Sequence, residues 1–177
     1  MIGDRFEVVD ATAFPAFPEI EETGTTFLEN ARLKAGGISC RVEGWVLSDD
    51  SGLEVDALGG APGVWSSSFG GEEGNHAKNN ARLLVEMAGK IDRSARFRCT
   101  MVLARGGIEQ GNFSGTVEGH LVESVQGARG FGYDPLFVPV GHDRTFAELG
   151  DEIKNTLSHR SRALVQVIAF LDKTRIK

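Results

Sequence analysis

Cysteine is scarce in this sequence. The 177 residues contain two cysteines, Cys40 and Cys99, and neither belongs to a C-x-x-C pair or a Cys/His cluster. This spacing argues against a zinc site and against a disulfide framework. A chain of this length buries roughly 70% of its unfolded surface in one core, so the fold needs no crosslink. We therefore expect a single domain over residues 1–177 in the reducing cytoplasm.

Long apolar runs and basic tracts are also missing. No run approaches the ~18 apolar residues that span a bilayer, and MIGDRFEVVD at the start lacks the basic and apolar regions of a signal peptide. The chain has 19 Lys+Arg against 25 Asp+Glu, a net charge of −6. Nucleic-acid phosphates need clustered Lys and Arg. We expect no membrane and no nucleic-acid partner, and any anionic ligand has to be held by local positive groups.

Glycine, by contrast, is in surplus. The sequence has 23 glycines, whereas average usage predicts about 12. They form short clusters such as residues 59–63 and 127–132, which are typical of tight loops between elements rather than of a linker. No internal repeat or low-complexity tract divides the chain, which again favours one domain.

The apolar spacing predicts alternating strands and helices. The sequence Thr26-Phe-Leu-Glu29 fits a capping box and predicts a helix from about Thr26, which either ends at Gly36-Gly37 or continues with tertiary support. The other expected elements are a strand at 6–9, a strand-turn-strand at 45–56, a helix at 75–90, a hairpin over 95–119, a strand at 136–138 and a final helix capped by Ser158. This pattern indicates an α/β fold with a mixed β-sheet and flanking helices.

Two adjacent carboxylates, Asp49 and Asp50, follow an apolar run at residues 45–47. Mg²⁺ typically takes one or two protein carboxylates and fills its other positions with water and substrate phosphates. Neighbouring strand residues point to opposite faces, so we expect the two aspartates not to share one ion: one faces a site while the other supports the fold. The alternative is an Asx-type turn in which an aspartate caps backbone N–H groups.

Two other groups have both a chemical and a structural interpretation. Asn30 and Lys34 share one helix face, where the lysine either meets a ligand or is solvated. Phe131, between two glycines, either stacks on a base or packs a turn.

Basic residues gather where the last helix begins. Lys154 precedes Ser158-His-Arg160, although the helix dipole favours negative charge at this end. A bound anion would balance these charges, and Asp151 and Glu152 are the alternative partners.

These segments together resemble one family. In chain order they are Glu22-Thr-Gly-Thr-Thr-Phe27, Glu29-Asn-Ala31, Leu33-Lys-Ala35, Ser48-Asp-Asp-Ser-Gly-Leu53, Gly59-Gly-Ala-Pro-Gly63, Gly130-Phe-Gly-Tyr-Asp-Pro135 and Ser158-His-Arg160. Each is weak alone, but their shared order resembles the inosine/xanthosine triphosphate pyrophosphatase family, also called the HAM1 or RdgB type. The resemblance implies Mg²⁺-dependent hydrolysis of ITP, dITP or XTP to the monophosphate and pyrophosphate, which removes deaminated purines from the nucleotide pool. It also implies two lobes around a central cleft and a homodimer.

The resemblance also implies roles for individual residues. Asp50 matches the catalytic proton acceptor and a Mg²⁺ ligand, and Glu22 matches the second carboxylate near the metal. The residues that match substrate contacts are Lys34, Ser51, Phe131, Gly132, Tyr133, Asp134, Lys154, His159 and Arg160. A 6-keto purine needs donors that meet O6, and the candidates are His159, Arg160 and backbone N–H groups near Phe131.

Two features depart from the family pattern. Family members begin with a strand and a helix carrying T-G-N-x-x-K, which holds the phosphates, whereas residues 1–18 contain no lysine. The simplest explanation is a start codon assigned too late or a deliberately shortened chain, and a genuinely truncated enzyme is the alternative. In addition, Ser66-Ser-Ser68 stands where many bacterial members read S-A-R, so a phosphate-side arginine is absent at Ser68. We therefore expect poor hydrolysis by the chain as given, and the alternative function is a catalytically weakened or silent purine-nucleotide-binding protein.

Overall fold

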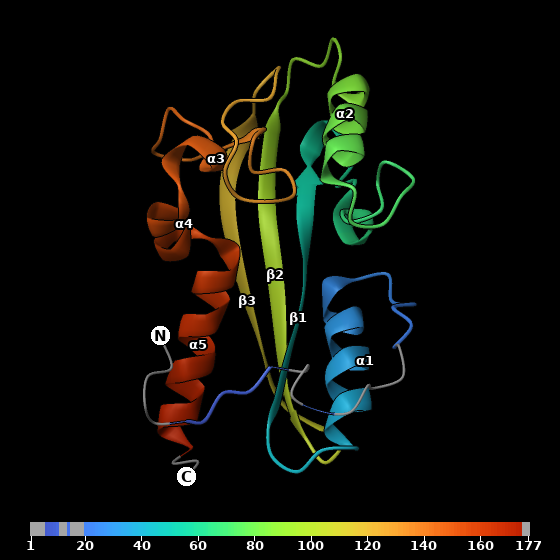
Figure 1. Ribbon diagram of the computed structural model, residues 1–177, viewed down its shortest axis with the longest axis vertical. Helices are drawn as coiled ribbons and strands as arrows, with labels where there is room; N and C mark the ends of the chain where they lie inside the picture. Colours follow the sequence, from blue (N-terminus) through green and yellow to red (C-terminus); the bar gives the residue numbers. More distant parts are fainter. Residues whose placement is uncertain (1–5, 11–13, 15–19, 175–177) are drawn as a thin grey trace.

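An antiparallel sheet runs through the computed structural model, which describes residues 6–10, 14 and 20–174. Within these residues the strand order is β1-β2-β3-β4. The strands are β1 (Val46–Val55), β2 (Ser94–Arg105), β3 (Ile108–Leu121) and β4 (Phe137–Pro139). Figure 1 shows that β2 and β3 extend along most of the elongated molecule.

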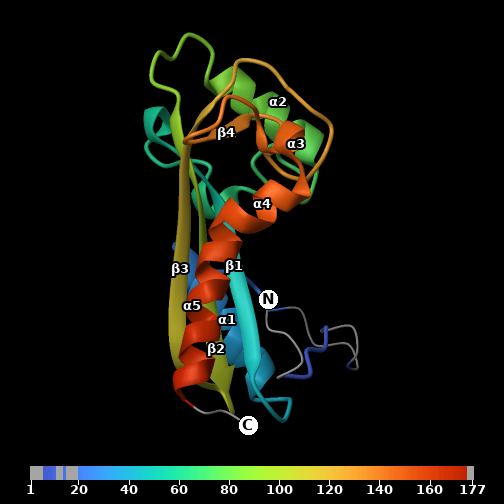
Figure 2. The same ribbon diagram turned by 90° about the vertical axis from the view of Figure 1, so that its left-hand side faces the viewer.

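Helices cover both faces of this sheet. They are α1 (Phe27–Ser39), α2 (His76–Glu86), α3 (Phe146–Leu149), α4 (Asp151–Leu157) and α5 (His159–Lys173), with short 3₁₀ helices η3 (Asp56–Leu58) and η4 (Gly63–Trp65). Side chains alternate across β2, so α1 packs on Val102 and Ala104 while α5 packs on Cys99 and Met101 from the opposite face. Figure 2 shows the molecule from the side on which α5 lies.

The buried apolar residues form separate cores in two lobes. One lobe contains α2, α3, α4 and β4 and has the largest core, in which Leu53, Leu83 and Phe137 are fully buried. The other lobe contains α1 and α5, each packed on its own face of the long strands. The α/β class, the flanking helices and the two lobes expected from the sequence are confirmed.

Three local expectations need correction. Every strand pair in the described part of the chain is antiparallel, whereas a mixed sheet was expected. Residues 45–56 do not form a strand-turn-strand or an Asx-type turn, because β2 pairs with β1 without interruption, Asp50 opposite Thr100 and Gly52 opposite Arg98. Residues 6–9 are not a strand, and Val8 and Val9 are exposed.

Helix α1 begins at the expected capping box and continues through both of its glycines. Thr26 Oγ1 accepts a hydrogen bond from Glu29 N at 3.2 Å, and Glu29 Oε2 accepts one from Thr26 N at 3.0 Å. Ala31 and Ala35 are fully buried against the sheet. This packing supplies the tertiary support that a helix with internal glycines needs.

We predict that Thr26→Ala lowers the free energy of unfolding by about 1 kcal/mol, because α1 loses its side-chain N-cap. Urea denaturation of both proteins measures this difference. Thr156→Ala is the matched control: this exposed hydroxyl only donates to Glu152 O within α4, so its loss should cost less than about 0.5 kcal/mol. Equal stability of Thr26→Ala and the parent chain would contradict the prediction.

Candidate active site

The candidate site lies at β1, the edge strand of the described sheet. Asp49 and Asp50 point to opposite faces of this strand, as the sequence predicted, and Asp50 meets α1 while Asp49 meets α5. Both nevertheless line one pocket, because at an edge the two faces are not separated by another strand. The sequence assigned one aspartate to a site and the other to the support of the fold; the structure places both at the pocket, where Asp49 also pairs with Arg160 of α5.

Asp50 is held by side chains of α1. Its Oδ2 accepts a hydrogen bond from Asn30 Nδ2 at 3.0 Å, and the Asn30 amide is itself oriented because its Oδ1 accepts from Gly24 N at 2.8 Å. Lys34 Nζ lies 3.7 Å from Asp50 Oδ1 and 2.9 Å from Glu22 Oε2. Burial raises the pKa of Asp50, while Asn30 and Lys34 act in the opposite direction. One ammonium group thus bridges two carboxylates that face each other.

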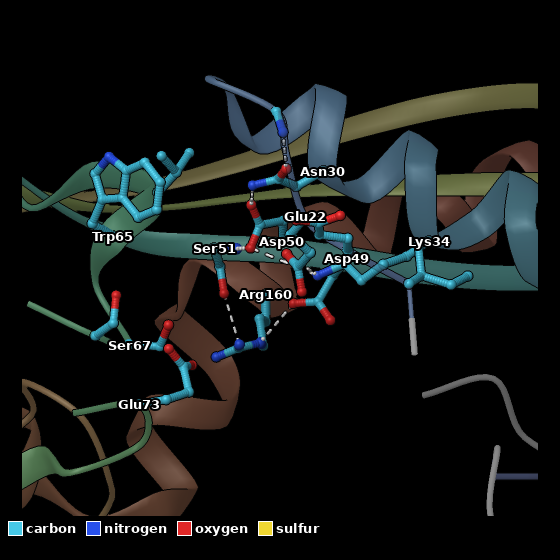
Figure 3. Close-up of a pocket in the computed structure, with 15 residues that line it drawn as sticks. Glu22, Asn30, Lys34, Asp49, Asp50, Ser51, Trp65, Ser67, Glu73 and Arg160 are labelled. Atoms are coloured by element: carbon cyan, nitrogen blue, oxygen red, sulfur yellow. Dashed lines mark hydrogen bonds and ion pairs between the residues drawn. The ribbon is translucent and has the colours of Figure 1, made fainter. Parts of the chain in front are cut away.

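Asp49 and Ser51 hold Arg160 on the other face of β1. Arg160 Nε donates to Asp49 Oδ2 at 3.0 Å, and its Nη2 donates to Ser51 Oγ at 2.6 Å. Figure 3 shows the guanidinium spread between these two residues. Arg160 therefore pairs with Asp49 rather than with Asp151 or Glu152, which lie exposed in the first turn of α4.

The pocket that Asp49 and Asp50 line has a volume of about 580 Å³ and is called the larger pocket, because a smaller one adjoins it. It is lined mainly by polar side chains, and the described charged ones among them are Glu21, Glu22, Lys34, Asp49, Asp50, Glu73 and Arg160. Ser67 and Ser68 contribute from the loop after η4, so the structure brings Ser68 to this pocket as a neutral side chain. Trp65 stands exposed at its border.

A smaller pocket of about 150 Å³ adjoins the first and shares Ser51, Ser67 and Arg160 with it. Phe131 lines it with 52% of its surface exposed, and Lys154 Nζ lies 3.8 Å from the centroid of the ring. Asp134 fixes this arrangement, because its Oδ2 accepts from Phe131 N at 2.9 Å and also pairs with Lys154. The turn is therefore held by Asp134 and not by packing of the Phe131 ring, which stays half exposed.

Tyr133 connects the wall of the smaller pocket to the loop after η4. Its ring is buried, and its hydroxyl donates to Ser66 O at 2.8 Å. Ser66 Oγ accepts from Leu53 N at 2.9 Å and thereby ties the loop to β1. The loop lies so close to the strand that a Cβ on Gly52 would be 2.3 Å from Gly63 O. The hydroxyl of Tyr133 is thus engaged by the protein, and its ring lines the smaller pocket.

His159 lies at the first position of α5, after the Ser158 N-cap that the sequence predicted. Its ring stacks on Phe97 with the centroids 5.0 Å apart. Burial, and then the charges of Arg160 and Lys154, lower the pKa of His159 to about 3. The imidazole is therefore neutral at pH 7, and its buried Nδ1 has no hydrogen-bond partner among the described residues.

The structure brings all the residues proposed from the sequence to these two adjoining pockets. The expected absence of a T-G-N-x-x-K segment concerns residues 1–18, and most of these residues lie outside the described part of the chain. Sequence reasoning missed Asn79 and Asn80, whose side chains bond the loops around the pockets. Their signal was present: Asn79 precedes Leu83 by four residues on the apolar face of a helix, where a polar residue needs a partner.

Comparison with known proteins matches residues 1–170 to the Ham1 family. A dITP/XTP pyrophosphatase of Bacillus licheniformis is 50% identical over 158 residues, which cover 88% of this chain and 81% of the relative. A dITP/XTP pyrophosphatase of Halalkalibacterium halodurans is 46% identical over 175 residues, which cover 97% of this chain and 90% of the relative.

Solved structures agree with this match. The structure of the Staphylococcus aureus Ham1 protein has a TM-score of 0.84 at 40% identity, covering 88% of this chain and 81% of that chain. A HAM1 protein from Coxiella burnetii has a TM-score of 0.83, also at 40% identity and with the same coverage. With sequence and fold in agreement over most of its length, the chain belongs to the Ham1 family.

Proposed function

We propose that this chain hydrolyses ITP, dITP or XTP to the nucleoside monophosphate and pyrophosphate with the help of Mg²⁺. The observation that carries the proposal is the junction of the two pockets. A polar pocket containing Asp50 adjoins an aromatic pocket containing Phe131, and Ser51 and Arg160 line both. Such a junction suits a ligand with a polyanionic end and a flat, polar-edged end. The names of the two bacterial relatives support the same substrate class.

Glu22 and Asp50 form a donor set that fits Mg²⁺. Their carboxylates converge on one cation, because Lys34 Nζ contacts both of them. The described residues contain no group of three or more His, Cys, Asp or Glu placed to hold a metal. The proposed ion therefore has two protein carboxylates and completes its shell from water and phosphate, as Mg²⁺ does. When bound, Mg²⁺ supplies charge neutralisation for the triphosphate.

Asp50 is the proposed general base. Its carboxylate, oriented by Asn30, accepts the proton of a water that attacks the α-phosphorus. The bond between the α-phosphorus and the oxygen bridging to the β-phosphorus then breaks, and pyrophosphate leaves with the electron pair. Lys34 and Arg160 face the same pocket and offset part of the negative charge that spreads over the phosphoryl oxygens.

The smaller pocket supplies base recognition in this proposal. Phe131 offers an exposed ring for stacking. The Arg160 guanidinium only donates hydrogen bonds, and a neutral His159 donates from one ring nitrogen, so both suit the O6 acceptor of a 6-keto purine. The 6-amino group of adenine would place donor against donor, which leaves buried polar groups unpaired and disfavours ATP.

A homodimer and a cytoplasmic location stay predictions. Among the described residues, no helix combines the length and the apolar character that crossing a bilayer requires.

We predict that Asp50→Asn lowers pyrophosphate release from ITP by roughly 10²- to 10⁴-fold, because the amide cannot accept the proton of the water. The assay supplies Mg²⁺ and ITP, dITP, XTP or ATP, and converts pyrophosphate to phosphate with inorganic pyrophosphatase for malachite-green detection. Asp56→Asn is the matched control, since this exposed carboxylate after β1 pairs with Arg96. Undiminished release by Asp50→Asn would refute the role of Asp50. Binding of IMP by a parent chain that releases no pyrophosphate would favour the silent binding protein.

A second prediction concerns the metal. EDTA should abolish release of pyrophosphate and added Mg²⁺ should restore it. Glu22→Gln should raise the Mg²⁺ concentration needed for half-maximal rate by roughly tenfold or more, because one of two carboxylates is lost. Glu86→Gln, which removes an exposed carboxylate of α2 that pairs with Arg82 and lines neither pocket, should leave this concentration unchanged. An unaltered Mg²⁺ titration of Glu22→Gln would remove Glu22 from the metal site.

A third prediction concerns the pH dependence of stability. The pKa of His159 is about 3 in the folded chain and about 6.5 when unfolded, so below pH 6.5 the unfolded state binds the extra proton. Stability is retained above pH 6.5 and falls as the pH drops toward 3, by about 2 kcal/mol between pH 7 and pH 5.

Urea unfolding of the parent chain and of His159→Gln at pH 7 and pH 5 tests this linkage. The glutamine variant should lose about 2 kcal/mol less between the two pH values, because it lacks the titrating group. His120→Gln, which removes an exposed imidazole of β3, should behave like the parent chain. The same pH dependence in all three proteins would contradict the prediction.

A further inference from the structure

Side chains of helix α2 form hydrogen bonds with the loops that line the two pockets. Two consecutive asparagines on this helix, Asn79 and Asn80, are 1% and 8% exposed. Neither lines either pocket. Burying an amide costs free energy unless its donor and acceptor find partners. Asn79 has a partner for each, whereas Asn80 Oδ1 has none among the described residues and only its Nδ2 is bonded. The partners that are present indicate the role of each side chain.

Asn79 binds the backbone of the loop beside the larger pocket. Its Oδ1 accepts from Gly70 N at 2.6 Å, and its Nδ2 donates to Ser67 O at 2.8 Å. The loop lies directly on the helix there, because a Cβ on Gly70 would be 2.6 Å from the carbonyl carbon of Lys78. The clamped segment carries Ser67 and Ser68 into the larger pocket.

Asn80 binds the turn beside the smaller pocket. Its Nδ2 donates to Gly132 O at 3.0 Å. Gly132 stands between Phe131, the exposed ring, and Tyr133, whose hydroxyl reaches Ser66 O. The hydrogen bond from Asn80 therefore fixes the backbone on which the aromatic wall of the pocket is built.

The helix that carries both asparagines is anchored in the core. Leu83 is fully buried and Met87 is 1% exposed, both in the core of the lobe. Asn79 shares their face of α2, since residues four apart are neighbours on a helix. The two loops thus take their positions from a helix that is anchored in the core. The asparagines that connect the helix to the loops line neither pocket.

We propose that Asn79 and Asn80 are positioning residues with separable tasks, Asn79 setting the phosphate-side loop and Asn80 setting the base-side turn. This inference rests on the proposed function. Loss of the Asn79 clamp then lowers turnover of every nucleoside triphosphate by the same factor. Loss of the Asn80 hydrogen bond weakens binding in a way that depends on the base.

The test uses three substitutions and one control in the full chain. Asn79→Asp keeps the acceptor for Gly70 N but turns the donor to Ser67 O into an acceptor, and Gly70→Ala disturbs the same contact from the loop. Asn80→Leu removes the donor to Gly132 O and keeps the number and branching of the side-chain heavy atoms. The matched control is Ser39→Ala: this 1% exposed hydroxyl accepts from Gly107 N at 3.1 Å at the far end of α1, so its loss affects stability without touching either loop.

The readouts are kcat and KM for ITP, XTP and ATP, thermal unfolding, and IMP affinity by calorimetry. Asn79→Asp and Gly70→Ala should lower kcat/KM about 10- to 100-fold by a factor common to all three triphosphates. Asn80→Leu should raise the KM for ITP and weaken IMP binding roughly tenfold, and should lower the preference for ITP over ATP. Ser39→Ala should lower the unfolding temperature and leave every kinetic constant unchanged.

Parent-like kinetics in folded Asn79→Asp or Gly70→Ala would overturn the role of Asn79, and Gly70→Ala decides if Asn79→Asp does not fold. An equal loss on all three substrates in Asn80→Leu would overturn the separation of tasks. If the parent chain hydrolyses none of the three, the proposed function fails instead. The IMP affinity of Asn80→Leu then decides the inference: a roughly tenfold loss supports it, and parent-like affinity overturns it.

Discussion

The edge position of β1 determines how the site is built. Inside a sheet, the alternating side chains of a strand enter two separate layers. At the edge, Asp49 and Asp50 point to opposite faces but still open into one pocket. A helix on each face then contributes one cation, Lys34 from α1 and Arg160 from α5. The packing of both helices on the long strands is therefore also what places opposite charge on both sides of β1.

Charge balance limits what this pocket can hold. Among the described residues, five carboxylates and two cationic side chains line it, and the whole chain carries a net charge of −6. A bare triphosphate would be repelled by this surplus of negative charge, since the pocket walls focus the field. In the proposed reaction a divalent cation neutralises some of these carboxylates, which is the same requirement that phosphoryl transfer makes. The acidity of the pocket is thus consistent with the metal–nucleotide complex that the proposed function invokes.

Features that depend on neighbouring residues could be predicted from the sequence. The capping box at Thr26, the Ser158 cap and the shared helix face of Asn30 and Lys34 follow from spacings of three or four residues. The opposite faces of Asp49 and Asp50 were predicted, but the continuation of one strand through residues 48–52 was not. Its hydrogen-bond partners lie about fifty positions away in β2 and override the local preference of Asp, Ser and Gly for turns. The same limit applies to the partners of Asn79 and Asn80, which are backbone atoms of two distant loops.

The turn beside the smaller pocket is held from two sides. Asp134 accepts from Phe131 N and pairs with Lys154, and Lys154 lies over the Phe131 ring. Asn80 donates to Gly132 O from α2, so the ring, the cation and the turn are already ordered, and binding a flat ligand there requires little further ordering. His159 stays neutral because burial disfavours its charged form, and because a third positive charge beside Arg160 and Lys154 would also be repelled. A neutral imidazole keeps both a donor and an acceptor, and this pairing capacity is what His159 contributes to the base recognition proposed above.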